Sequence, residues 1–172
     1  MSQRWMAITE SQFPWEQAAL NYVREHFPNQ DPFCAWSNLE FMAEDGSINE
    51  VDLLVVSLYK MYLVEIKSRP GRVSGDAGTW TWADEGRTFT DDNPLLLANR
   101  KAKKLKSLLQ HQNALRNSRV PYIEPLIFLS APGLRCELEG AARHGICVWQ
   151  DNAGEGFPDI VSVLSGVTDT TV

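Results

Sequence analysis

The chain has 172 residues, of which 44% are apolar, and a formal net charge of −6 at pH 7. This size fits one globular domain with a substantial core, which we expect at residues 1–165, followed by a linker-like tail at 166–172. The sequence has no apolar run long enough to cross a membrane and no secretory signal at its start. Its acidity argues against non-specific nucleic-acid binding by the whole surface.

The cysteines predict the redox environment. Cys34, Cys136 and Cys147 are odd in number, widely spaced and set among apolar residues. No CxxC motif or neighbouring histidine pair accompanies them, so neither a disulfide framework nor a zinc site is favoured. We therefore expect reduced structural thiols in a cytoplasmic protein.

The first predicted helix covers residues 14–26, because Pro14 suits a first helical turn and apolar side chains recur at helical spacing. Glu16 falls inside the apolar arc of this helix rather than opposite it. A carboxylate on an inward helix face caps a group, pairs with a charge or takes part in chemistry. The alternative for Glu16, a surface acid, stays open.

Strands are predicted next, at residues 33–42, 48–56 and 61–68, with the turn "EDGS" after the first of them. A further β-hairpin is expected around "GTWTWADEGRTFT", where Trp80 and Trp82 alternate with polar residues. We predict that both tryptophans belong to the core.

A long basic helix is predicted at residues 95–116. Its leucines and alanines recur at helical spacing, and no Asp or Glu occurs between Asn93 and Ile123. The same acid-free segment carries seven basic residues, which are Arg100, Lys101, Lys103, Lys104, Lys106, Arg116 and Arg119. They predict either a local nucleic-acid-binding patch or simply a solvated helix face.

The remaining elements are a buried strand at residues 124–130, a short helix within 133–145 and a last strand at 146–150. Helices and strands therefore alternate along the chain. This order predicts an α/β domain in which a mixed β-sheet lies between helices.

Charged residues interrupt the most apolar part of the chain, the hairpin "EVDLLVVSLYKMYLVEIKS" at residues 50–68. The two strands can pair in two ways that differ by a shift of one residue. In one of them Asp52 lies directly across from Glu65, and Lys67 shares their face because side chains alternate. A shift by one residue would move Asp52 to the other face, so the hypothesis depends on the register. The alternative is a simple salt bridge on an edge strand, although both faces of these strands are apolar.

Two carboxylates held this close repel unless a positive charge lies between them. Oxygen ligands from Asp52, Glu65 and the Ile66 backbone carbonyl suit Mg²⁺, or Mn²⁺ in its place. Lys67 would then orient or deprotonate an attacking water, or neutralise charge in the transition state.

Asp52, Glu65 and Lys67 in this spacing resemble the PD-(D/E)xK phosphodiesterases and, more narrowly, the nuclease-related domain (NERD) family. The resemblance continues through "PGRVSGDAGTW", "DDNPLLLANRKAKKLKSLL" and "YIEPLIFLS". It implies a restriction-endonuclease-like fold, with a central mixed β-sheet flanked by α-helices. It also implies that Glu16, in "FPWEQAAL", matches an acid that the family carries on its first helix.

The resemblance therefore implies a Mg²⁺-dependent nuclease that hydrolyses nucleic acid, with DNA as the expected substrate. Asp52, Glu65 and Glu16 would bind metal, and Lys67 would serve catalysis. Four basic residues of the long helix would contact phosphates, namely Arg100, Lys101, Lys103 and Lys104. Similar domains stand at the start of larger proteins, including kinases of phage-defence systems of the BREX or phage-growth-limitation kind, so further domains of the same polypeptide are expected partners.

Two alternatives remain from the sequence. The domain could keep the nuclease fold without cutting, as a nucleic-acid-binding or regulatory module. It could instead be a protein-interaction domain that regulates an attached enzyme. The presence of all three hairpin residues favours the nuclease.

Overall fold

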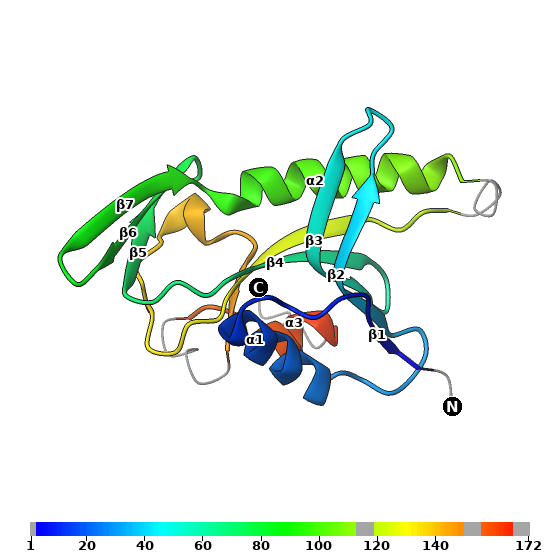
Figure 1. The fold of residues 1–172 in the computed structure, drawn as a ribbon, viewed down its shortest axis with the longest axis horizontal. Coiled ribbons are helices and arrows are strands. Elements are labelled where there is room, and N and C mark those ends of the chain that lie inside the picture. Colours follow the sequence, from blue (N-terminus) through cyan, green and yellow to red (C-terminus); the bar gives the residue numbers. More distant parts are fainter. Residues whose placement is uncertain (1–2, 113–118, 150–155, 167–172) are drawn as a thin grey trace.

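The computed structural model describes residues 3–112, 119–149 and 156–166 (Figure 1). Its helices are α1 (Pro14–Glu25), α2 (Pro94–Gln110) and α3 (Ile160–Leu164), with a 3₁₀ turn at Gly140–Arg143. Its strands are β1 (Trp5–Ala7), β2 (Cys34–Met42), β3 (Ile48–Val56), β4 (Met61–Lys67), β5 (Arg72–Gly75), β6 (Thr79–Asp84), β7 (Arg87–Asp92), β8 (Ile123–Leu129), β9 (Arg135–Cys136) and β10 (Ile146–Val148).

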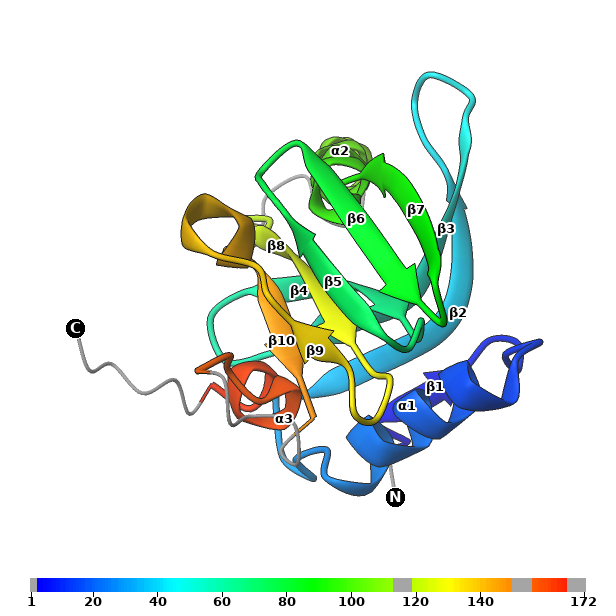
Figure 2. The ribbon, with the colours of Figure 1, turned by 90° about the vertical axis from the view of Figure 1, so that its left-hand side faces the viewer.

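The strands form two sheets. The larger has the order β1-β2-β3-β4-β8-β10, and it is mixed because β2, β3 and β4 pair antiparallel while β8 pairs parallel with β4 and β10. The smaller has the order β7-β6-β5-β9 and projects beside the first turns of α2 (Figures 1 and 2). The predicted α/β fold with a central mixed sheet between helices is confirmed.

Alternation along the central strands creates two apolar cores, one on each face of the larger sheet. Leu63 points into the core that α2 covers with Ala98 and Leu105. The next residue, Val64, points into the core that α1 and α3 cover. The burial of both faces explains why β4 reads as a nearly continuous apolar run.

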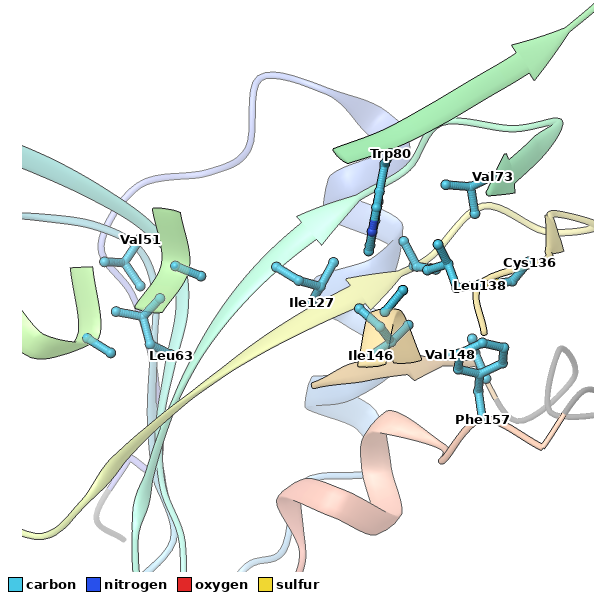
Figure 3. Close-up of a cluster of buried hydrophobic side chains, with 14 of the residues drawn as sticks. Val51, Leu63, Val73, Trp80, Ile127, Cys136, Leu138, Ile146, Val148 and Phe157 are labelled. Atoms are coloured by element: carbon cyan, nitrogen blue, oxygen red, sulfur yellow. The ribbon is translucent and has the colours of Figure 1, made fainter. Parts of the chain in front are cut away.

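The smaller sheet is joined to the larger one through the core under α2. Trp80 is fully buried there and lies near Ile127 and Leu138 (Figure 3). Trp82 is also buried, so the prediction that both tryptophans belong to the core is confirmed. The β6–β7 hairpin is thereby fixed against β4 and α2.

Local signals account for the start and end of α2. The Asn93 side chain accepts a hydrogen bond from Leu95 N at 2.9 Å, and Pro94 occupies the first helical position. The helix ends at Gln110, earlier than predicted, because exposed His111 and Gln112 offer no apolar contact after Leu109. The rest of the predicted helix, at 113–116, lies outside the described residues.

Other differences from prediction have tertiary causes. The short helix expected within 133–145 is a strand, β9, followed by a 3₁₀ turn. Arg135 N and Glu137 N donate to backbone carbonyls beside and within β5, and this pairing overrides the local helical pattern. Strands β1, β5 and β9 and helix α3 were not predicted. Gly166 apart, the predicted tail lies outside the described residues.

The three cysteines are free, and Cys136 and Cys147 are buried, as structural thiols should be. Within the described ranges, no helix is long and apolar enough to span a membrane.

Candidate active site

The β3–β4 register is the one that the sequence hypothesis requires. Leu53 pairs with Val64 and Val56 with Met61, so the next position along the hairpin sets Asp52 across from Glu65. The regular ladder stops there. One step further, the Ile66 N–H donates to the Asp52 carboxylate at 2.8 Å. Asp52 therefore lies where two strands begin to separate.

The neighbouring strand is also irregular at this level. Ser37 pairs with Leu53 and Leu39 with Val51, which leaves Asn38 across from Asp52 but outside the ladder. Asn38 has a positive φ of 52°, a conformation that asparagine tolerates better than most residues. Its side-chain amide donates to Thr9 O at 3.1 Å. The backbone ladder is thus interrupted on both sides of Asp52, whose half-buried side chain lines a cleft.

Glu16 reaches the same place from the first turn of α1. Protonated Asp52 can donate a hydrogen bond to Glu16, and the two carboxylates repel when both are ionised. Burial, followed by the charge of Glu65 and then that of Glu16, raises the pKa of Asp52 from 3.8 to about 7, against the lowering effect of the Ile66 N–H. Asp52 would therefore release its proton readily when a cation binds beside it.

Glu65 has a different partner. Lys101 of α2 donates to Glu65 Oε1 at 2.8 Å and to the Glu50 backbone carbonyl at 2.7 Å. The side chains of Lys101 and Glu65 are only 12% and 14% exposed, so this ion pair is largely shielded from water. A lysine from the covering helix thus supplies the positive charge that Glu65 needs in this structure.

The backbone next to Glu65 offers an oxygen towards Asp52. Ser130 N donates to Lys67 O at 3.0 Å, on the β8 side of β4. Carbonyl directions alternate along a strand, so the Ile66 carbonyl points to the opposite edge, towards β3 and Asp52. Asp52, Glu65 and this carbonyl form the hard-oxygen donor set that Mg²⁺ prefers, and Glu16 lies beside it.

The donor set fits a divalent cation chemically, because burial and then the charges of Glu65 and Glu16 raise the pKa of Asp52, and a cation would offset those charges. It is not a closed metal cage. Across the described part of the chain, no three His, Cys, Asp or Glu side chains are grouped so as to hold a metal on their own. Binding would depend on the carbonyl and on waters to complete the coordination shell.

Lys67 lies two residues after Glu65 on the same face of β4, half-buried. In the described ranges its side chain makes no ion pair or hydrogen bond. Lys67 and Glu65 both line a cleft of about 240 Å³ between the end of β4, the β6–β7 hairpin and the start of α2. We call this the β6–β7 cleft; it reaches half-buried Lys67 and borders Glu65, which its pair with Lys101 leaves only 14% exposed.

A second cleft, of about 280 Å³, lies on the other side of Asp52. Of the described residues, five acids and no lysine or arginine line it, the acids being Glu10, Glu16, Glu40, Glu50 and Asp52. We call it the acidic cleft. It disfavours phosphate unless cations are present, so the two sides of the site differ strongly in charge.

The four basic residues predicted to contact nucleic acid divide into two pairs. Lys101 and Lys104 are already paired: Lys101 holds Glu65 in a shielded ion pair, and Lys104 pairs with Asp45 at 3.2 Å on the surface. Arg100 and Lys103 are exposed, and their side chains have no ion pair or hydrogen bond in the described ranges. This exposed pair is the better placed for phosphates.

Sequence reasoning missed the contact between Lys101 and Glu65. Lys101 borders the buried positions Ala98 and Ala102 on the helix that follows the hairpin in sequence. A lysine next to buried helix positions indicated a partly buried side chain, but nothing in the sequence indicates that it lies beside Glu65. Arg69 and Phe89, which line the β6–β7 cleft, also gave no signal.

A mixed sheet with carboxylates gathered where two strands separate, beside a lysine on the same strand, defines a nuclease-like α/β domain. The family model described as "Nuclease-related domain" matches residues 11–130, and the chain belongs to that family.

A curated relative is the "Probable kinase PglW" of Streptomyces coelicolor, which is 39% identical over 144 residues. The match covers 83% of this chain but only 9% of the relative, so the chain corresponds to a small part of that much larger protein. No solved structure matches the chain.

Proposed function

We propose that this domain is a Mg²⁺-dependent or Mn²⁺-dependent phosphodiesterase that hydrolyses nucleic acid, with DNA as its substrate. The observation that carries the proposal is the meeting of Asp52 and Glu65 across the β3–β4 hairpin, with Lys67 on the same face. Three charged side chains gathered beside the buried part of this hairpin are costly unless they serve a site.

In this proposal Asp52, Glu65 and the Ile66 carbonyl hold the cation, and Glu16 completes the shell directly or through water. The bound cation supplies a Lewis acid that polarises the scissile phosphate and lowers the pKa of an attacking water. Asp52 would give up its proton on binding, since burial and then the charges of Glu65 and Glu16 raise its pKa, and a cation would offset those charges.

In this proposal Lys67 acts in the hydrolysis step itself. Its side chain lines the cleft that Glu65 also lines, where it can orient the attacking water or neutralise the charge that builds on the phosphoryl oxygens. Exposed Arg100 and Lys103 would bind flanking phosphates from α2.

Cleavage of supercoiled plasmid and of single-stranded circular DNA with Mg²⁺ or Mn²⁺ tests the proposal. We expect Asp52→Asn and Lys67→Ala each to lose about 100-fold or more in rate, as for loss of a general acid–base or charge-stabilising group. Arg24→Ala, which removes an exposed basic residue in the last turn of α1, is the control for loss of one positive charge. Equal rates in wild type and both site variants would reject the assignment.

A second candidate is a nucleic-acid-binding or regulatory module that does not cut. The ion pair between Lys101 and Glu65 favours it, because a lysine already neutralises one of the proposed metal ligands. This candidate predicts salt-sensitive binding of nucleic acid that Lys67→Ala leaves unchanged, without turnover in any metal.

The relative's name suggests a setting for either activity. We propose that the domain works as part of a larger polypeptide that also contains a kinase, in a cytoplasmic phage-defence system. Pull-down or co-purification of the nuclease activity with a protein kinase activity from native cells would test this context.

A further inference from the structure

The β6–β7 cleft contains an arginine–aromatic stack. The guanidinium of Arg69, two residues after the end of β4, lies over the Phe89 ring at 4.5 Å from its centre and over the Trp82 ring at 5.9 Å. Phe89 and Trp82 are paired across β6 and β7. Trp82 is 7% exposed and anchors the stack, while Phe89 is 45% exposed and presents ring surface to solvent.

This stack is continuous with the candidate active site. Glu65, Lys67, Arg69 and Phe89 all line the same cleft, and Arg100 of α2 lies at its other wall. Figures 1 and 2 both show the β6–β7 hairpin beside the first turns of α2, with β4 running up to it. A ligand bound on Phe89 would therefore extend directly towards Lys67.

The charges of the two clefts favour this one for a polyanion. The β6–β7 cleft has Lys67, Arg69 and Arg100 among its lining residues. Of its acids, Glu65 is already paired with Lys101, and Asp91 and Asp92 are exposed to solvent. The acidic cleft has no basic side chain among the lining residues that the structure describes, so a strand carrying phosphates would enter from the β6–β7 side.

We propose that the β6–β7 cleft is a subsite for one unpaired nucleotide next to the scissile phosphate, an inference that rests on the proposed nuclease function. The base stacks on the Arg69–Phe89 pair, and Arg100 binds the adjoining phosphate. A base inside a duplex has both faces covered by its neighbours, whereas an unpaired base can stack on an aromatic ring. The substrate class is therefore single-stranded or locally unpaired nucleic acid.

Fluorescence anisotropy with labelled oligothymidylate, free or annealed to oligoadenylate, tests the subsite. EDTA is present so that binding is measured without metal-dependent cleavage. We expect the single strand to bind more tightly than the duplex. Phe89→Ala and Phe89→Leu should each weaken single-strand binding by about 5-fold to 150-fold, the range for loss of one base–aromatic stack. Phe89→Trp should keep the affinity.

Tyr59→Ala is the matched control, since Tyr59 is the most exposed of the large hydrophobic side chains in the described residues and lies in the β3–β4 turn, at the other end of β4. It should leave binding unchanged. Arg69→Lys should weaken binding although it keeps the charge, because lysine lacks the planar group that stacks. Thermal unfolding of each variant confirms that the fold persists.

Equal single-strand affinity for wild type and Phe89→Ala would overturn the subsite, as would tighter binding of the duplex. These results are distinct from failure of the nuclease proposal. Phe89-dependent binding without hydrolysis in Mg²⁺ or Mn²⁺ would reject the nuclease alone. Hydrolysis that is indifferent to Phe89 would reject the subsite alone.

Discussion

Lys101 of α2 holds Glu65 of β4 through a 2.8 Å ion pair that is largely shielded from solvent. The helix that covers the central sheet thus reaches into the candidate metal site. Lys101 also donates to the Glu50 carbonyl, which ties the helix to β3 as well as to β4. The Lys101 side chain therefore both attaches α2 to β3 and β4 and neutralises the Glu65 carboxylate.

The first prediction concerns this ion pair. Lys101→Met keeps much of the side-chain volume but leaves Glu65 without its cation. We expect the metal-free variant to lose about 3 kcal/mol of unfolding free energy, as for a buried pair that loses one partner. We also expect it to bind Mn²⁺ about tenfold more tightly, because lysine and metal compete for the same carboxylate. Urea unfolding and titration calorimetry measure the two effects.

Lys103→Met, an exposed lysine two positions along α2, is the control for the first prediction. It should change the unfolding free energy by less than about 0.5 kcal/mol. If Lys101→Met bound Mn²⁺ no better than this control, Lys101 and the metal would not share a ligand.

The second prediction follows from the raised pKa of Asp52. In the folded protein this pKa is about 7, above the ordinary value of 3.8, so the native state binds the extra proton between these values. Stability in EDTA should therefore fall as pH rises from about 4 to about 7, and the penalty should be complete above that range. Asp52→Asn removes the titration but can still accept from Ile66 N.

We accordingly expect Asp52→Asn to melt at a higher temperature than wild type near pH 8, with the difference shrinking towards pH 4. Calorimetry across this range measures it. A difference between the two proteins that did not vary with pH would show that Asp52 is ionised throughout, and the account of the site would need revision.

The third prediction compares nucleic-acid binding by two lysines of α2, exposed Lys103 and ion-paired Lys104. Lys103→Ala should weaken nucleic-acid binding and reduce its salt dependence by about one charge, because an exposed lysine is available to a phosphate. Lys104→Ala should have little effect on binding, since Lys104 is occupied by Asp45 and Ser47. Binding isotherms at several salt concentrations distinguish the two. The reverse ranking would place the phosphate path along the Lys104 edge of the helix.

The fourth prediction tests the start of α2, on which the β6–β7 cleft depends. Asn93 is buried and caps the helix by accepting from Leu95 N at 2.9 Å. Asn93→Ala should cost about 1–2 kcal/mol of unfolding free energy. Asp92→Ala, at the exposed neighbouring position, should cost less than about 0.5 kcal/mol. Similar losses in the two variants would mean that the cap does not stabilise the helix.

Local patterns in the sequence were enough for the elements that carry the proposed chemistry. The long apolar runs of β3 and β4, with their charged interruptions, predicted the hairpin, and Pro14 marked the start of α1. The register could only be posed as a condition, because the "SLYK" connection has no residue that specifies a turn type. The observed pairing of Leu53 with Val64 satisfies that condition.

What could not be predicted depends on contacts between distant segments. Strand β9 forms because Arg135 and Glu137 donate to carbonyls of Gly71 and Val73, more than sixty residues earlier. Lys101 meets Glu65 only because α2 packs against the sheet with this residue beside β4. Arg69 and Phe89 come together only when the smaller sheet folds against the end of β4. Periodicity along the chain gives no information on any of these.

The most direct test of the central claim is to locate manganese by anomalous scattering in crystals grown with Mn²⁺. We predict one ion between the carboxylates of Asp52 and Glu65, contacting the Ile66 carbonyl, with the Lys101 ammonium displaced from Glu65. The Asp52→Asn variant should lose the peak. A wild-type crystal without an anomalous peak there, and with Lys101 still bound to Glu65, would contradict the assignment of this site as a metal-dependent nuclease centre.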